Sequence, residues 1–306
     1  MKNRLEEMLK SIETSQIKKF LKKTFMKYNN SHNNNNNNNN HNHYNEDPLS
    51  NLENINRSNL LHAYYRYIWN SNFSSPIERN LHSGANVIDL GCGSGIWLTE
   101  LSSEYSNSNF IGIDNNEIFP IEKVSKNLKF IKHNILNGIP FEDNTFDFIH
   151  VRFMIKCFSE TEWKTLILPE IFRICKPGGW IEIMDSDTNL YNAGPKTEGY
   201  NRKINSMFGL SKFDMDQLQD IMNIYQDLGI TIMKEKINAW YPFKSQNSDK
   251  PFEMTSEILK SLYPLMSKVL NLNQENYARL SKQILEEITK NKTYGKTYRI
   301  ITQKHL

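Results

Sequence analysis

Short apolar runs alternate with segments of helical periodicity through the central part of the chain. Apolar runs bounded by glycine or polar residues predict strands at 85–90, 110–113, 128–132, 146–151 and 180–184. A helix is predicted at 96–105, and a second one reaches residue 174 after a capping-box pattern formed by Ser159 and Glu162. The sequence Lys-Pro-Gly-Gly at 176–179 ends that second helix. Strands that alternate with helices predict an α/β fold, with a parallel sheet covered on both faces.

The alternation changes after residue 187. Helices are predicted at 214–228, 252–270 and 274–291, and Asp214 with Gln217 caps the first of them. Strands are predicted at 230–240 and 298–302. We interpret 188–229 and 250–292 as elements of a helical cap inserted late in the chain.

The N-terminal part differs in composition from the rest. Residues 1–28 have apolar positions at spacings of three and four, which predicts an amphipathic helix or a solvated tail. Residues 29–57 form an Asn-rich linker that has little to bury and is expected to be disordered. The folded domain is therefore predicted over 58–306, and the tail is a candidate for binding a protein partner.

The composition limits the class of protein. A hydrophobic fraction of 38% is enough for a sizeable core, and a net charge of +3 gives no strong field toward nucleic acid, so a nucleic-acid partner is not expected. The three cysteines lack Cys-x-x-Cys spacing, so we expect neither a disulfide framework nor a metal site. No secretory signal and no apolar run of membrane-spanning length is recognised, which predicts a soluble cytoplasmic or nuclear protein.

The stretch VIDLGCGSG, at 87–95, has glycines at alternate positions after a predicted strand and before a predicted helix. Such loops bind ligands at the carboxyl edge of an α/β sheet. The dinucleotide pattern Gly-x-Gly-x-x-Gly fails at Ile96, no lysine follows as in a phosphate-binding loop, and Asp89 would repel a pyrophosphate. A cationic ligand without phosphate is favoured, and S-adenosylmethionine is such a ligand. Asp89 suits its cationic end, and Asp114, at the end of the second strand, suits its ribose.

Five segments together resemble the class I S-adenosylmethionine-dependent methyltransferases: VIDLGCGSGIW, FIGIDNN, NLKFIKHNIL, IPFEDNTFDFIHVRF and ICKPGGWIEIMDSD. The resemblance is dense over 85–187, and it implies a Rossmann-like sheet of seven strands, six parallel and the last antiparallel, with helices on both faces. GSGIW, PFEDNTFDFIHVRF and KPGGWIEIM further resemble the fungal-type group that contains velvet-associated regulators of secondary metabolism and related methyltransferases. Two positions depart from the pattern: Asn134 stands where the family often has Asp, and Asp185 where the closer relatives often have Glu.

The resemblance also implies which residues bind S-adenosylmethionine. Asn134 and Ile135 would contact the adenine. Arg152 would contact the cofactor carboxylate or an acidic acceptor, unless it pairs structurally with Asp185 or Asp187. The full set of expected cofactor residues is Asp89, Gly91, Cys92, Gly93, Gly95, Asp114, Asn115, Asn134, Ile135 and Arg152.

His150 is the candidate catalytic residue, as a general base for a hydroxyl or ammonium acceptor. Its alternation with Ile149 and Val151 favours another interpretation, a core histidine hydrogen-bonded to the backbone. Asp114 has the alternative of a solvated acid at a strand end, and Asn134 that of an ordinary turn residue.

Two functions stay open at the level of the sequence. The first is a methyltransferase with a small-molecule or protein acceptor, in which catalysis comes largely from aligning the acceptor with the activated methyl group. The second is a regulatory or scaffold protein that keeps the fold with little turnover. Aromatic residues of the predicted cap would either shape a small-molecule pocket or pack the cap against the sheet. These residues are Tyr191, Tyr200, Phe208 and Phe213.

Overall fold

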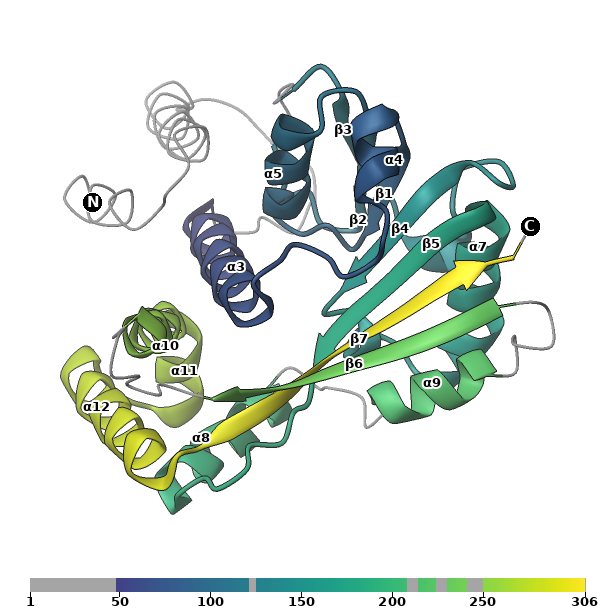
Figure 1. The fold of residues 1–306 in the computed structure, drawn as a ribbon. Helices are drawn as coiled ribbons and strands as arrows, with labels where there is room; N and C mark the ends of the chain where they lie inside the picture. Colours follow the sequence, from purple (N-terminus) through teal and green to yellow (C-terminus); the bar gives the residue numbers. More distant parts are fainter. Residues whose placement is uncertain (1–47, 121–124, 208–213, 224–229, 241–249, 306) are drawn as a thin grey trace, which may run out of the picture.

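The protein is described here by a computed structural model that covers residues 48–120, 125–207, 214–223, 230–240 and 250–305. The helix predicted at 1–28, most of the Asn-rich linker, Phe208 and Phe213 lie outside the described residues. The described chain forms a sheet of seven strands in the order β3-β2-β1-β4-β5-β7-β6 (Figure 1).

The strand pairing matches the predicted pattern. The strands are β1 (Asn86–Leu90), β2 (Asn109–Asp114), β3 (Leu128–Lys132), β4 (Phe146–Arg152), β5 (Cys175–Ser186), β6 (Ile230–Trp240) and β7 (Tyr294–Lys304). The first five pair in parallel, and β7 is antiparallel to both β5 and β6. Because β6 then runs with the first five, six strands are parallel and one is reversed, which confirms the fold class expected from the sequence.

The helices connect these strands. They are α3 (Pro48–Trp69), α4 (Glu78–Ser83), α5 (Ile96–Glu104), α6 (Glu160–Glu162), α7 (Leu168–Ile174), α8 (Pro195–Met207), α9 (Met215–Asn223), α10 (Lys250–Ser261), α11 (Tyr263–Leu270) and α12 (Gln274–Asn291). Short 3-10 turns form η1 (Ile135–Asn137) and η2 (Ile155–Cys157), and a π-helical segment, η3 (Trp163–Ile167), joins α6 to α7. The predicted capping box is present, because the Ser159 hydroxyl accepts from the Glu162 N–H while the Glu162 carboxylate accepts from the Ser159 N–H.

Alternate residues of the central strands face two separate cores. On β1, Val87 packs with Leu98 of α5 and Leu81 of α4, whereas Ile88 packs on the other side with Ile171 of α7. Each face of the parallel sheet is therefore closed by helices (Figure 1). This two-sided burial explains why the strands appear in the sequence as short apolar runs.

The late helices divide between the sheet and a cap. Helix α9 packs against one face of the sheet, because Leu218 and Met222 are buried in the same core as Ile171 of α7. The helices α8, α10, α11 and α12 gather at one end of the molecule around a core of their own (Figure 1). Tyr200 lies inside that core with its hydroxyl 2.5 Å from the hydroxyl of Tyr277, so it packs the cap.

Two expected boundaries differ from the structure. The segment predicted as one helix at 252–270 is two helices, since Pro264, near the start of α11, cannot donate the backbone hydrogen bond that continuity needs. Helix α3 begins at Pro48, so residues 48–57 are helical and do not belong to a disordered linker. Leucine or isoleucine recurs every three residues at 49, 52 and 55, a helical signal that the neighbouring asparagines obscure.

Candidate functional site

The glycine loop between β1 and α5 requires glycine at its alternate positions. Gly91, Gly93 and Gly95 have φ of +73°, +54° and +70°, a region that side chains with a Cβ rarely adopt. A Cβ on Gly95 would lie 2.4 Å from Cζ of Phe130, and one on Gly91 would lie 2.3 Å from Sδ of Met154. The loop is therefore held close to its neighbours, as predicted for a turn that a ligand or another backbone must approach.

The N–H groups of this loop point back into the protein. The first two loop residues, Gly91 and Cys92, donate to the carbonyl of Ile113 at 2.8 and 3.0 Å. Gly93 donates to Oδ2 of Asp114 at 2.8 Å, and the N–H at 95 donates to the carbonyl at 92. A loop that binds phosphate aims such groups at the ligand. These four are already occupied, so the arrangement does not suit a pyrophosphate.

Asp114 ends β2 beside this loop with its carboxylate fixed from two sides. Its Oδ2 accepts from Gly93, and its Oδ1 accepts from the N–H of Asn116, both at 2.8 Å. Partial burial raises the pKa of Asp114, and these hydrogen bonds oppose that rise. The N–H of Asn115 also acts on this carboxylate, so of its roughly four acceptor positions about one remains for a ribose hydroxyl. Asn115, the next residue, is exposed.

Asp89 and His150 form a buried pair under the loop. They occupy paired positions on β1 and β4, and Oδ1 of Asp89 lies 2.8 Å from Nδ1 of His150. Their exposed fractions are 4% and 1%. The indole of Trp97, on α5, stacks on the imidazole with ring centroids 3.8 Å apart. His150 is thus a core histidine held by a carboxylate and not by the backbone, and its catalytic role stays a prediction.

The same row of the sheet continues into a buried ion pair. Glu182, on β5, pairs in register with His150, and its Oε1 lies 3.3 Å from Nε of Arg299 on β7. Its Oε2 accepts from the N–H groups of Ser74 and Ser75 at 2.8 Å. Glu182 therefore fixes the segment between α3 and α4 to the centre of the sheet.

Cys92 and Ile135 are placed with their side chains in the core. Cys92 packs under the loop near Leu98, and burial raises the pKa of its thiol well above the usual value, so it does not present a thiolate. Ile135 lies in the core on the α7 side. A contact of either residue with a ligand would involve its backbone.

Asn134 has a local structural role in the structure. Its side-chain oxygen accepts the N–H of Leu136 at 3.0 Å and caps η1. That is the turn role which the sequence left open. The adenine contact proposed for this side chain stays a prediction.

Arg152 meets a partner that the sequence did not indicate. Its guanidinium donates to Nδ1 of His62, on α3, at 3.1 Å. The structural pairing with Asp185 or Asp187 is not observed. The Asp185 carboxylate accepts the N–H groups at 155 and 186, and the Asp187 carboxylate accepts the N–H at 189 and the hydroxyl of Tyr191. Backbone N–H groups and a tyrosine hydroxyl are the partners of these two acids, so this alternative for Arg152 is not supported.

Helix α3 lies directly over the glycine loop. The hydroxyl of Ser94, in the loop, donates to the side-chain oxygen of Asn59 at 3.0 Å and lies 3.2 Å from the hydroxyl of Ser58. Four residues along, Nε2 of His62 lies 3.1 Å from the Glu100 carboxylate on α5. None of these contacts was predicted, since their only sequence signal is a set of polar residues on one face of α3.

An aromatic cluster lies at the carboxyl edge of the sheet, beside the end of β4. Phe153 directly follows β4 and has a φ of +59°, a strained conformation for an aromatic residue. Its ring lies 4.8 Å from that of Tyr65 on α3. Tyr64 and Met184 are buried in this cluster, and Met254 of α10 packs against it. The backbone strain at Phe153 and this buried aromatic cluster occur together between α3, the end of β4 and the cap.

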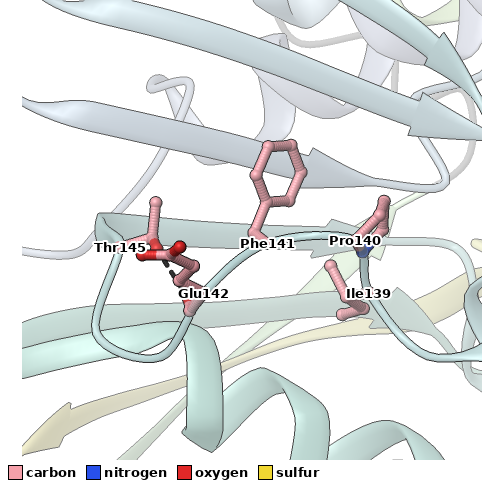
Figure 2. A pocket seen from close by; sticks show the side chains of 5 residues that line it. All are labelled: Ile139, Pro140, Phe141, Glu142 and Thr145. Atoms are coloured by element: carbon pink, nitrogen blue, oxygen red, sulfur yellow. Dashed lines mark hydrogen bonds between the residues drawn. The ribbon is translucent and has the colours of Figure 1, made fainter.

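A surface pocket elsewhere does not include the site. It lies along the connection from η1 to β4, and Figure 2 shows the residues that line it: Ile139, Pro140, Phe141, Glu142 and Thr145. None of them is an expected cofactor residue. In the part of the chain that the structure describes, no helix has the length and apolar character to cross a membrane.

Comparison with known proteins shows what the central part of the chain is similar to. Residues 87–179, from β1 into β5, match the family model described as a methyltransferase domain. The chain is 29% identical to methyltransferase str3 of Strobilurus tenacellus over 113 residues, which cover 37% of this chain and 39% of that protein. It is 30% identical over 135 residues to the secondary metabolism regulator LAE1 of Cochliobolus heterostrophus, covering 44% and 41%. Residues 87–179 of this chain are therefore similar to the methyltransferase domain of S-adenosylmethionine-dependent enzymes.

The extent of the similarity differs among these relatives. The matched part spans about two fifths of the length of str3 and LAE1. A longer match, at 23% identity over 231 residues, covers 71% of this chain and 78% of N-methyltransferase verN of Clonostachys rogersoniana. The methyltransferase domain is thus the shared part.

The residues present fit the family's cofactor, S-adenosylmethionine. Four N–H groups of the loop are already paired within the protein, which matches a ligand that has no phosphate. Asp114 has an acceptor position left for a ribose hydroxyl. Asp89 supplies negative charge beside the loop, where the cationic methionine end would lie.

Proposed function

We propose that this protein transfers a methyl group from S-adenosylmethionine to a small, largely apolar acceptor. The observation that supports it most is the glycine loop, in which the N–H groups of Gly91, Cys92 and Gly93 donate to β2 while Asp114 keeps an acceptor position. That combination disfavours dinucleotides and favours an adenosyl ligand without phosphate. When bound, the cofactor supplies an activated methyl group on a sulfonium.

In this proposal the chain's own residues bind and orient. Asp114 accepts a ribose hydroxyl, Asn134 and the backbone at 135 lie toward the adenine, and Asp89 attracts the ammonium. His150 holds Asp89 in one orientation through the 2.8 Å contact. Methyl transfer needs alignment of acceptor and donor more than proton transfer, so a site with no exposed base is consistent with the reaction.

The acceptor would lie against the aromatic cluster between α3 and α10. The cluster contains Tyr64, Tyr65, Phe153 and Met184, next to the end of β4. Apolar and aromatic walls with a few polar groups are typical of small-molecule sites. The hydroxyls of Tyr65 and Ser186, 2.6 Å apart, provide such a polar group.

Calorimetric titration with S-adenosylhomocysteine tests the cofactor assignment, with NAD as the control ligand. We expect micromolar binding of the first and no binding of the second. The reverse preference, or binding of neither, would overturn the proposal.

A methyl-transfer assay on a panel of small aromatic and amine acceptors then separates the enzyme from a regulatory protein. The regulatory alternative is motivated by the similarity to LAE1, and it would show cofactor binding without turnover on any acceptor. Turnover on one acceptor class identifies the enzyme.

A further inference from the structure

Four charged or titratable side chains form a chain of contacts from β4 to the surface of α3. Arg152 donates to Nδ1 of His62 at 3.1 Å, and Nε2 of His62 lies 3.1 Å from Oε2 of Glu100. The same Oε2 lies 3.0 Å from the guanidinium of Arg66. His62 is 2% exposed, in contrast to Arg66, whose side chain is 47% exposed. The imidazole thus sits between a cation and an anion in the interior.

The chemistry of these partners fixes the state of the ring. A guanidinium has only donors, so Nδ1 of His62 must accept and cannot carry a proton. The remaining proton is then on Nε2, which lies 3.1 Å from Oε2 of Glu100. His62 is therefore neutral, in the Nε2–H tautomer, and a second proton would place an imidazolium 3.1 Å from the Arg152 guanidinium.

We propose that His62 is a positioning residue that holds Arg152 in place for the carboxylate of the bound cofactor, and that α3 is thereby part of the cofactor site. The inference rests on the proposed function. Arg152 ends β4 at the carboxyl edge of the sheet, where the loop and Asp114 lie. Its guanidinium has five donors, and the bond to His62 uses one of them. A carboxylate takes two such donors in parallel, provided that the guanidinium is held in one plane.

The surrounding charges agree with a neutral ring. Burial lowers the pKa of His62 most, and Arg152 and Arg66 lower it further, whereas the hydrogen bond with Glu100 opposes the shift. The groups that face His62 and Arg152 from the packed elements are Tyr65 and Arg66 of α3, Asp89 of β1, Glu100 of α5 and Arg299 of β7. Protonation of the ring is therefore confined to pH values below its ordinary range.

Two substitutions at position 62 separate positioning from packing. His62→Gln keeps a neutral group with one acceptor and one donor, whereas His62→Phe keeps the ring and removes both. At pH 7.5 we expect His62→Gln to bind S-adenosylhomocysteine within about threefold of the wild type and His62→Phe to bind about tenfold more weakly or worse. His82→Gln, on the exposed face of α4, is the matched control and should bind like the wild type.

The pH profile gives the second readout. As the pH falls from 7.5 toward 5, the wild type should lose affinity relative to His62→Gln, because only the wild type gains a proton at this position. Parallel profiles for the two proteins would overturn the inference, as would wild-type affinity in His62→Phe.

A third readout needs no ligand. Nitrogen-15 NMR of the full chain should show His62 as the Nε2–H tautomer, and Arg152→Gln should raise the pKa of this ring because it removes the nearest cation. An Nδ1–H tautomer would refute the positioning role of His62 while leaving the proposed cofactor binding untouched. Absence of S-adenosylhomocysteine binding in the wild type at every pH would instead refute the proposed function.

Discussion

Replacing Asp114 by asparagine separates the ligand role of this carboxylate from its role in the loop. In the wild type, one oxygen accepts from Gly93 and the other from Asn116, both at 2.8 Å. The amide of asparagine has a single oxygen, so it can keep only one of these two hydrogen bonds. It also removes the negative charge that the ribose hydroxyls would meet.

Two opposing effects set the expected size of the changes. A hydrogen bond to a charged group contributes about 1.5–3 kcal/mol, so the loss of one destabilises the fold. Burial raises the pKa of Asp114, which means that its charge is unfavourable there, and a neutral amide relieves that cost. The unfolding free energy should therefore change by less than about 2 kcal/mol. The affinity for S-adenosylhomocysteine has no such relief and should fall by about 10–100-fold.

A ligand that lacks the hydroxyls makes the test specific. Calorimetric titration of wild type and Asp114→Asn is carried out with S-adenosylhomocysteine and with its 2′,3′-dideoxy analogue. The variant should show the full loss of about 10–100-fold in affinity for S-adenosylhomocysteine but a loss of less than about threefold for the dideoxy analogue. The analogue has no hydroxyl that could hydrogen-bond to the carboxylate, so the substitution removes no contact with it. Asp143→Asn, whose side chain is 70% exposed, is the control and should change neither affinity. Equal losses with both ligands, or no loss with the first, would refute the assignment of the ribose to Asp114.

Three further predictions concern stability. Gly91→Ala should lower the unfolding free energy by about 2 kcal/mol or more, because it combines a φ of +73° with a 2.3 Å approach to Met154; an unchanged midpoint in denaturant would contradict this. Glu182→Ala should cost about 3–5 kcal/mol, because it removes the carboxylate that faces the buried Arg299; Glu182→Gln should lose less in the same assay, and equal losses would argue against a charge effect. Burial raises the pKa of Asp185 to about 6, above its unfolded value, so the contribution of this group to stability falls as the pH rises from about 4 to about 6. Asp185→Asn should abolish this decrease in unfolding free energy, which amounts to roughly 3 kcal/mol between about pH 4 and pH 6. Identical pH–stability curves for the two proteins would contradict the assigned role of Asp185.

The parts of the site that were predictable from sequence are those set by local pattern. The alternate glycines, with the acid that ends the second strand, mark a strand–loop–helix unit whose geometry follows from backbone sterics. Asp114 could therefore be placed beside Gly93 without knowledge of the rest of the fold. The mostly parallel sheet with a reversed last strand also followed, through the resemblance of its motifs.

The contacts that sequence reasoning missed join residues far apart in the chain. Arg152 and His62 are 90 positions apart, and neither has a neighbour that marks it as a partner. A polar residue on a helix is by default a solvated one, so the burial of His62 could not be anticipated. Helix α9 was expected in the cap but packs against the sheet. Periodicity predicts the apolar face of a helix but not the element that covers this face.

The inward hydrogen bonds of the glycine loop have a consequence for the thermodynamics of ligand capture. A loop whose amide groups are satisfied by β2 is ordered when the chain folds, so a ligand does not have to organise it at the moment of association. The side chains of α3 that face Ser94 are hydrogen-bonded to the loop as well, so they too are held before a ligand binds. Much of the entropic cost of ordering the binding loop is therefore met when the chain folds and not when the ligand binds.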